Sequence, residues 1–292
     1  MSSNIILNKN HINNSFNSEL RYEFNKAHTF SKGDTIAVSH INLFYSWFNI
    51  TKNYNNNKFQ YVWWDANGDL TDIKDIIIPD GYYSINILNE FLQSQMVKNN
   101  HYLTNGSNNI YFIELLTNSV YYSIEIRLSS LKTTEEFGDN VIIPNNATWQ
   151  LPNEYQTPKI NILSNNNFGK YLGFNAGSVF QDFTTNTPST RDNYSFLNDF
   201  NPSIDPSFSY NITCNLVENN LSIPNNVLTS FATPNGVSIG DLINFNADVI
   251  YSKIKEGTYK EIVIKIYDQD FNLLRIKDNN MLFVLSVLKQ DN

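Results

Sequence analysis

Acidic residues gather at two places in this chain of 292 residues. The first place holds four aspartates: Asp65, Asp69, Asp72 and Asp75. Ca²⁺ prefers several oxygen ligands on a flexible turn, so this spacing suggests a calcium loop. An EF-hand loop that starts at Asp65 needs Gly sixth and Glu twelfth, where this chain has Leu70 and Ile76. We therefore expect a solvated hairpin turn there, and a tight turn rather than a calcium site at the second place, residues 268–272.

The other residue types that carry chemistry do not form a recognisable site. Cys214 is the single cysteine, so an internal disulfide is excluded and a reducing compartment fits. It alternates with Ile212 and Leu216 on one face of a predicted strand, which favours a buried, inert thiol. The histidines show neither HxxxH nor HxH spacing, the usual signature of a zinc site: His11, His28, His40 and His101. Gly169 and Gly173 lack the GK[ST] ending of a phosphate loop and indicate turn geometry.

Neither the motifs nor the charge balance point to catalysis. GxSxG and HExxH are absent, and a pair of glycosidase carboxylates cannot be recognised from sequence spacing. We therefore assign no catalytic, cofactor-binding or metal-binding residue, expect no cofactor, and predict that the protein is not an enzyme. The net charge of −8 argues against a sequence-independent grip on nucleic acid. The chain shows no signal-peptide pattern and no run of 18 apolar residues, so we expect no membrane insertion.

The composition favours strands, because 14% of the residues are aromatic and apolar residues alternate with polar ones. Asn67-Gly68 predicts a two-residue hairpin turn. Ser84 can cap the one helix that we expect, whose apolar positions repeat at three and four: Ile87, Leu88, Phe91, Leu92 and Met96. The predicted strands cover residues 19–24, 35–50, 59–65, 73–78, 110–116, 121–128, 208–217, 242–250, 259–268 and 281–289. This pattern predicts an all-β protein, a single jelly-roll sandwich of about eight or more antiparallel strands with one short helix and long loops.

The domain organisation that we expect is one arm and one domain. Residues 1–17 hold a short apolar cluster in a polar stretch without helical periodicity, which predicts an extended N-terminal arm. Residues 18–292 are expected to form a single jelly-roll domain. Its loop-rich insertion is placed at about 132–207, because six prolines fall there among short apolar islands. A linker between two domains is the alternative, but six residues there are too apolar for a free linker: Phe168, Tyr171, Leu172, Phe174, Phe180 and Phe183.

Five segments together resemble, in their order and distances, the minor capsid or penton proteins of virophages and the related Maverick/Polinton elements. The segments are IAVSHINLFYSWFNI, IIIPDGYYSINILNEFLQ, KYLGF, ITCNLVEN and IVIKIYDQDFNLLRIKDNNMLFVLSVLK. The resemblance runs from about residue 20 to residue 289. It implies a virion protein made in the host cytoplasm, a homopentamer that closes each icosahedral vertex beside a double jelly-roll major capsid protein. The family has no active-site motif to carry over, and the interface residues stay unassigned.

Two other functions remain open at this point. A carbohydrate-binding jelly roll, for example a host-attachment module, would stack an exposed Trp63 or Trp64 on a sugar ring. Adjacent residues of a strand face opposite ways, so at most one of the two can line such a platform. A glycan-cleaving enzyme would need two carboxylates in a cleft.

Overall fold

The computed structural model describes residues 2–132, 141–181, 193–205, 207–246 and 249–290. The chain divides into two compact units. The terminal unit consists of Met1–Trp47 and Ser207–Asn292, and the inserted unit is Phe48–Pro206. The inserted unit interrupts the terminal unit once, so the terminal unit is built from the two ends of the chain.

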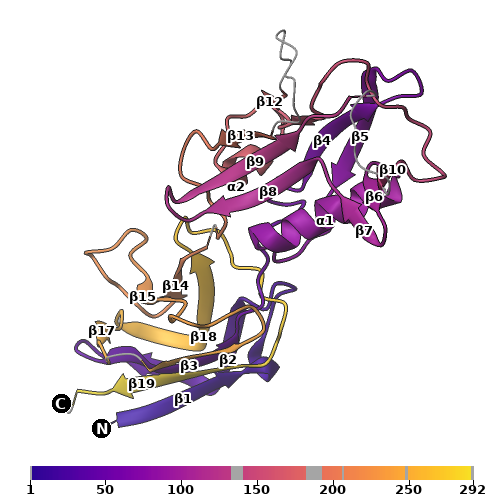
Figure 1. Cartoon of the computed structure of the whole chain (residues 1–292). Helices are drawn as coiled ribbons and strands as arrows, with labels where there is room; N and C mark the ends of the chain where they lie inside the picture. Colours follow the sequence, from indigo (N-terminus) through magenta and orange to yellow (C-terminus); the bar gives the residue numbers. More distant parts are fainter. Residues whose placement is uncertain (1, 133–140, 182–192, 206, 247–248, 291–292) are drawn as a thin grey trace. The chain divides into compact units, whose positions relative to one another are not determined.

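The terminal unit contains two antiparallel sheets (Figure 1). The first has the order β1 (Ser2–Asn8), β19 (Met281–Leu288), β3 (Thr35–Phe44) and β16 (Leu242–Asn246), and the short β17 (Ser252–Lys253) also pairs with β3. The second has the order β15 (Val227–Ala232), β14 (Ser209–Cys214), β18 (Gly257–Asp268) and β2 (Glu19–Phe30). The 3-10 helix η1 (Lys9–His11) follows β1.

The strand pairing of the terminal unit is that of a jelly roll. Its eight main strands form four nested pairs, β1 with β19, β2 with β18, β3 with β16 and β14 with β15. Successive pairs alternate between the two sheets, which makes one long folded hairpin of the kind that defines a double-sheet jelly roll. The predicted fold class, an all-β jelly roll of about eight antiparallel strands, is confirmed.

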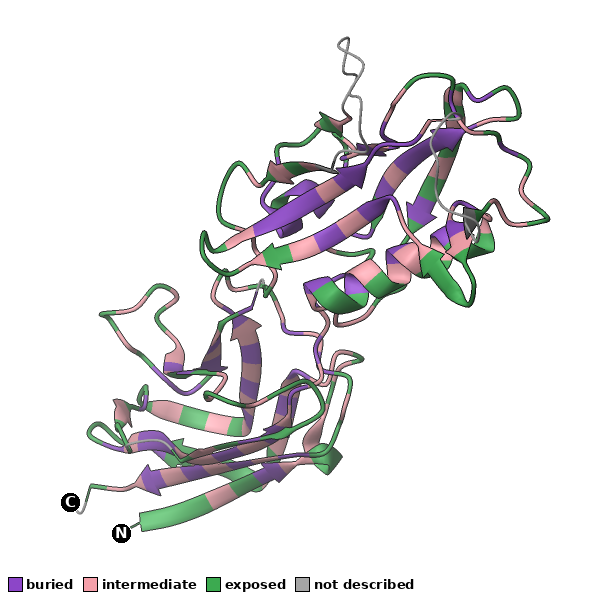
Figure 2. Ribbon diagram, viewed as in Figure 1, coloured by how far each residue is buried: buried purple, intermediate pink, exposed green. Residues whose placement is uncertain are grey.

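The core of the terminal unit follows from period-two alternation along the strands. On β19 each second side chain is buried, from Met281 to Val287, and the residues between them are half-buried (Figure 2). β18 presents Ile262, Ile264 and Ile266 in the same way, and each fully buried aliphatic side chain contributes about 1.5–3 kcal/mol. The predicted strand over 281–289 is thus buried on one face and half-buried on the other.

The first residues of the chain form a strand rather than the extended arm predicted for residues 1–17. Ser2–Asn8 pairs along its whole length with β19, and Leu7, opposite Phe283, is fully buried. The sequence pattern was misleading because β1 lies at the edge of its sheet. An edge strand needs few apolar residues, and β1 buries one side chain completely while Ile6 is 54% exposed.

The described residues of the inserted unit form three small sheets and two helices. The first sheet has the order β12 (Val179–Phe180), β11 (Lys159–Asn161), β4 (Lys58–Trp64), β5 (Leu70–Ile77). The second is β13 (Asn193–Leu197), β9 (Ser123–Ser129), β8 (Ile113–Asn118), and the third is β10 (Val141–Ile142), β6 (Leu103–Asn105), β7 (Asn108–Ile110). The helices are α1 (Ile85–Lys98) and α2 (Phe168–Leu172).

The helices show which local signals can be read from the sequence. The side chain of Ser84 accepts a hydrogen bond from the Ile87 amide, as expected for the cap of α1. The amide oxygen of Asn89 accepts from the Leu115 amide and ties α1 to β8. α2 was not predicted, because five residues are too short to show a helical period. It ends at Gly173, whose φ of +85° suits glycine.

The inserted unit has a hydrophobic core of its own, formed by residues between Ile50 and Phe174. The sequence had placed the hairpins β4–β5 and β8–β9 in a single domain of residues 18–292, with the insertion only at about 132–207. The structure has the insertion beginning at Phe48 and ending at Pro206. Alternation identifies a half-buried strand but does not show which of two cores the strand faces. The predicted insertion therefore begins at about residue 132 instead of Phe48.

The strand assignment of β1 predicts unequal effects at two neighbouring residues. Leu7→Ala should lower the free energy of unfolding of the terminal unit by about 2–5 kcal/mol, because it leaves a cavity in the core. Ile6→Ala, at an exposed position, should change it by no more than about 0.5 kcal/mol. Urea unfolding of both variants measures the difference. Equal, small effects would favour a free arm.

The separate core of the inserted unit predicts that residues 48–206 fold alone. The isolated segment should show dispersed amide signals and a cooperative thermal transition. A spectrum typical of an unfolded chain would show that the segment depends on the terminal unit.

Candidate functional site

Three of the four aspartates considered for calcium have side-chain contacts within the protein: Asp65, Asp72 and Asp75. The Asp65 carboxylate accepts hydrogen bonds from the backbone of Asn67 and Asp69, at 2.8 and 3.1 Å, and from the Thr71 hydroxyl at 2.8 Å. The Thr71 bond above all lowers the pKa of Asp65. Asp65 thus closes the β4–β5 hairpin turn, which Gly68 completes at a φ of +81°. In the described residues, no group of three or more His, Cys, Asp or Glu side chains is placed to hold a metal ion.

The second acidic place is also a turn. One carboxylate oxygen of Asp268 accepts from the backbone amides of Asp270 and Asn272, at 2.9 and 2.8 Å. Such bonds shape a tight turn and occupy the lone pairs that a cation would need. The turn after β18 is therefore the one that the sequence predicted.

Cys214 is fully buried on β14, and burial raises the pKa of its thiol to about 12. At neutral pH the group is a protonated thiol, which is a poor nucleophile. The prediction of a buried, inert cysteine is confirmed. His40, from the neighbouring sheet, lies on the polar side of β3, where its ring contacts the Asn246 amide.

A buried polar chain in the inserted unit was not predicted from the sequence. His101 Nδ1 lies 3.1 Å from the hydroxyl of Tyr61, and His101 Nε2 lies 3.3 Å from the Asp72 carboxylate. The Asn99 amide donates to the same hydroxyl at 2.8 Å, and the His101 ring stacks on Trp63 with centroids 5.0 Å apart. Its members come from β4, β5 and the end of α1, so only tertiary structure brings them together.

Burial governs the pKa values of the two rings in this cluster, His101 and Tyr61. Burial, more strongly than the opposing effect of the Asp72 carboxylate, lowers the pKa of His101 to about 4. Burial likewise raises the pKa of Tyr61. At neutral pH both rings are uncharged, and the hydrogen bonds hold the end of α1 against β4 and β5.

The tryptophans on which a sugar platform would depend are both buried. Trp63 and Trp64 are 0% exposed, although adjacent residues of a regular strand face opposite ways. The register between β4 and β5 shifts between these two residues, and this bulge accompanies the turning of both rings into the core. Each ring also packs against Trp149. Neither tryptophan is available to stack on a carbohydrate.

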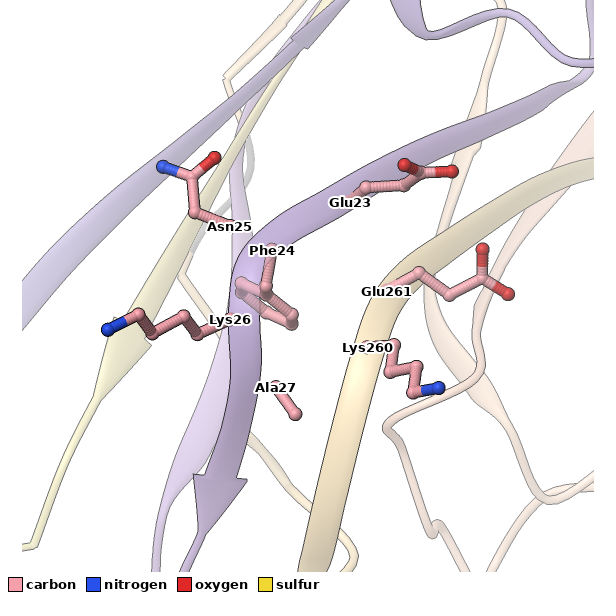
Figure 3. Close-up of a pocket in the computed structure, with 7 residues that line it drawn as sticks. All are labelled: Glu23, Phe24, Asn25, Lys26, Ala27, Lys260 and Glu261. Atoms are coloured by element: carbon pink, nitrogen blue, oxygen red, sulfur yellow. The ribbon is translucent and has the colours of Figure 1, made fainter.

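The terminal unit has a surface hollow of about 540 Å³ where the register of β2 and β18 breaks. Glu23 pairs with Glu261 and His28 with Tyr259, so residues 24–27 of β2 lie opposite Lys260 alone. Figure 3 shows Asn25 and Lys26 extending to one side of β2 and Lys260 and Glu261 to the other. The side chains that line the hollow are Glu23, Phe24, Asn25, Lys26, Ala27, Lys260 and Glu261. Mixed charge and a bulge at an edge strand oppose the addition of another strand.

The two sheets of the terminal unit differ in charge. β2 and β18 carry eight ionised side chains, several joined by ion pairs. Arg21 contacts Glu261 at 3.1 Å and Glu19 at 3.2 Å, and Lys265 contacts Glu19 at 3.2 Å. By contrast, β1, β19, β3 and β16 contain no Asp, Glu, Lys or Arg.

The chain was compared with known proteins. No family model and no curated protein matches it. The crystal structure of selenomethionine-labelled mavirus penton protein is similar over 99% of this chain and 98% of that chain, with 14% identity and a TM-score of 0.47. A chain of the 3.5 Å cryo-EM structure of the Sputnik virophage is similar over 99% of this chain and 97% of that chain, with 11% identity and a TM-score of 0.38.

The jelly-roll assignment itself rests on the strand order of the two sheets. The longer helix in the described residues has 14 residues, and neither helix meets the length and apolarity that crossing a bilayer needs.

The burial of His101 predicts a loss of stability in mild acid. Its pKa is about 4 in the folded chain and about 6.5 when unfolded, so the unfolded chain binds the proton more readily. The free energy of unfolding of the inserted unit should therefore fall as the pH drops from 6.5 to 4, by up to about 3 kcal/mol. Urea unfolding followed by tryptophan fluorescence measures the loss. His101→Gln should flatten this dependence, and an equal slope in both proteins would contradict the assignment.

Proposed function

We propose that this chain is a structural capsid protein that forms the homopentameric capsomer, or penton, at the icosahedral fivefold vertices of a virion. The observation that carries the proposal is the complete eight-stranded jelly roll of the terminal unit. The five ordered sequence segments that resemble virophage and Maverick/Polinton pentons support it independently. The partner would be a double jelly-roll major capsid protein, and the chain would be made in the host cytoplasm before it joins the particle.

The physical character of the terminal unit suits an assembly role without enzymatic activity. A ring of five copies is a closed head-to-tail arrangement, in which one flank of each copy meets a different flank of the next. Such contacts need shape and hydrogen bonds and no reacting group. Three side chains that could take part in catalysis have structural surroundings instead. Cys214 is buried, His101 is hydrogen-bonded to Tyr61, and Asp65 accepts a hydrogen bond from Thr71.

The alternative of a carbohydrate-binding module has lost its basis in Trp63 and Trp64, which lie in the core of the inserted unit. No other observation favours it over an assembly role. The inserted unit would instead be a second body carried by the capsid protein, between β3 and β14 of its jelly roll.

The proposed function predicts a defined mass in solution. Mass photometry of the purified chain, alone and with its major capsid protein, should show a species of about 170 kDa, five times the 33.7 kDa of one copy. Formation of this species only in the presence of the partner would also agree with the proposal. A chain that stays monomeric or dimeric under both conditions would contradict it.

A further inference from the structure

Apart from Lys253 on the short β17, the strands of the first sheet of the terminal unit carry no Asp, Glu, Lys or Arg, and His40 on β3 is their titratable residue. Its four main strands contain 7, 8, 10 and 5 residues, and none of these is Asp, Glu, Lys or Arg. At the 16% charged residues of the whole chain, a sample of this size would hold about five. Exposed sheet faces normally carry charged residues, which keep them solvated and separate.

The outer face of this sheet is apolar and amide-rich. Along β19 it presents Leu282, Val284, Ser286 and Leu288, all half-buried, between the inward-facing core residues. Ile6 lies beside Val284 on β1 and is 54% exposed. Across β3, the strand β16 adds Leu242, which is 46% exposed, together with two exposed asparagines, Asn244 and Asn246. We call this surface the neutral face.

The second sheet offers one surface of matching chemistry. Its outer side along β2 and β18 is a ladder of ion pairs, whereas its strands β14 and β15 contain no charged residue. The outer side of β14 and β15 presents Asn211 beside Ser230, whose hydroxyl donates to the Asn211 amide oxygen at 2.7 Å. Ser209 lies opposite Ala232 on the same side.

We infer that the neutral face is a contact between copies of this chain, seated on the outer surface of β14 and β15 of the neighbouring copy. The inference rests on the proposed function. Burying neutral amides that form hydrogen bonds across the contact, together with methyl groups, costs less desolvation free energy than covering the Arg21–Glu261 ladder, which would strip water from ions. The two surfaces belong to opposite sheets of one sandwich. Their contact is therefore head-to-tail rather than twofold, and it closes into a ring of five when the rotation between copies is that of a fivefold axis.

The size of the neutral face also favours a ring. Four strands about 4.8 Å apart and about eight residues long, at 3.3 Å per residue, cover about 500 Å². One contact would bury about 1,000 Å² in total, less than the 1,200 Å² or more typical of a stable pair. In a closed ring each copy makes two such contacts. The closed ring is therefore more stable than an isolated pair of copies joined by one contact.

A matched pair of valines tests the inference. Val284, on β19, lies in the middle of the neutral face, and Val263, on β18, is the half-buried counterpart on the charged side, opposite Arg21. Val284→Lys should lower the pentameric fraction at least tenfold, because it places an unpaired charge in the contact. Val263→Lys should assemble like the parent chain. Mass photometry with and without the major capsid protein measures both.

Two further variants complete the design. Ile6→Lys, at an exposed edge position, repeats the test without risk to the core, and thermal unfolding confirms that each variant is folded. Ser230→Lys should also prevent pentamer formation, since it lies on the facing surface. A folded Ile6→Lys that assembles normally, or equal losses for Val284→Lys and Val263→Lys, would overturn the neutral face as a contact. Normal assembly of Ser230→Lys would overturn the assignment of the facing surface.

The outcomes also separate this inference from the proposed function. If the parent chain forms pentamers and the variants do so equally, the inference fails and the proposed function stands. If the parent chain forms no pentamer, alone or with the major capsid protein, both fail together.

Discussion

The pairing of β19 with β1 on one side and β3 on the other holds the two ends of the chain in one sheet. Ser2 lies opposite Leu288, and Met281 lies opposite Leu43. The contact between Ser2 and Leu288 closes a loop of nearly the whole chain, and loop closure of this length costs conformational entropy. β19 offsets this cost by burying every second side chain in the core. The other three pairs of the jelly roll are nested inside this outermost one.

The same nesting explains how the chain accommodates a second body. β3 and β14, which flank the inserted unit, lie in different sheets and do not pair with each other. A long insertion between them therefore breaks no ladder of hydrogen bonds. Because Phe48–Pro206 has its own buried cluster, it needs no apolar surface from the jelly roll to fold.

Local signals in the sequence predicted the elements whose causes are local. The helix capped by Ser84 and the buried Cys214 follow from neighbouring residues, as does the β4–β5 hairpin, although residues 65–69 connect its strands in place of the predicted two-residue turn. The start of the inserted unit could not be predicted in this way. The apolar pattern of β4 is compatible with packing in the core of either unit, so it does not show to which unit the strand belongs. β15 (Val227–Ala232) was missed, because its six residues bury only Leu228 and Phe231. β1 was misread for a similar reason.

The candidate site depended still more on tertiary structure. The hydrogen-bonded side chains of Asp72, His101 and Tyr61 join the β4–β5 hairpin to the segment after α1, which is distant from the hairpin in sequence. The neutral face is likewise invisible until β1, β19, β3 and β16 are known to be neighbours, although the absence of charge from each strand can be read directly. What a strand presents to solvent is a local property. Which strands present it together is a property of the fold.

The central claim is that this jelly roll is a vertex protein whose flanks join copy to copy. A cryo-EM reconstruction of particles assembled from this chain and its major capsid protein tests that claim most directly. The account predicts five copies of the chain around each fivefold axis, with the strands β1, β19, β3 and β16 of each copy against β14 and β15 of the next. Vertices without the chain, or a ring in which the β2 and β18 ladder fills the contact, would contradict it.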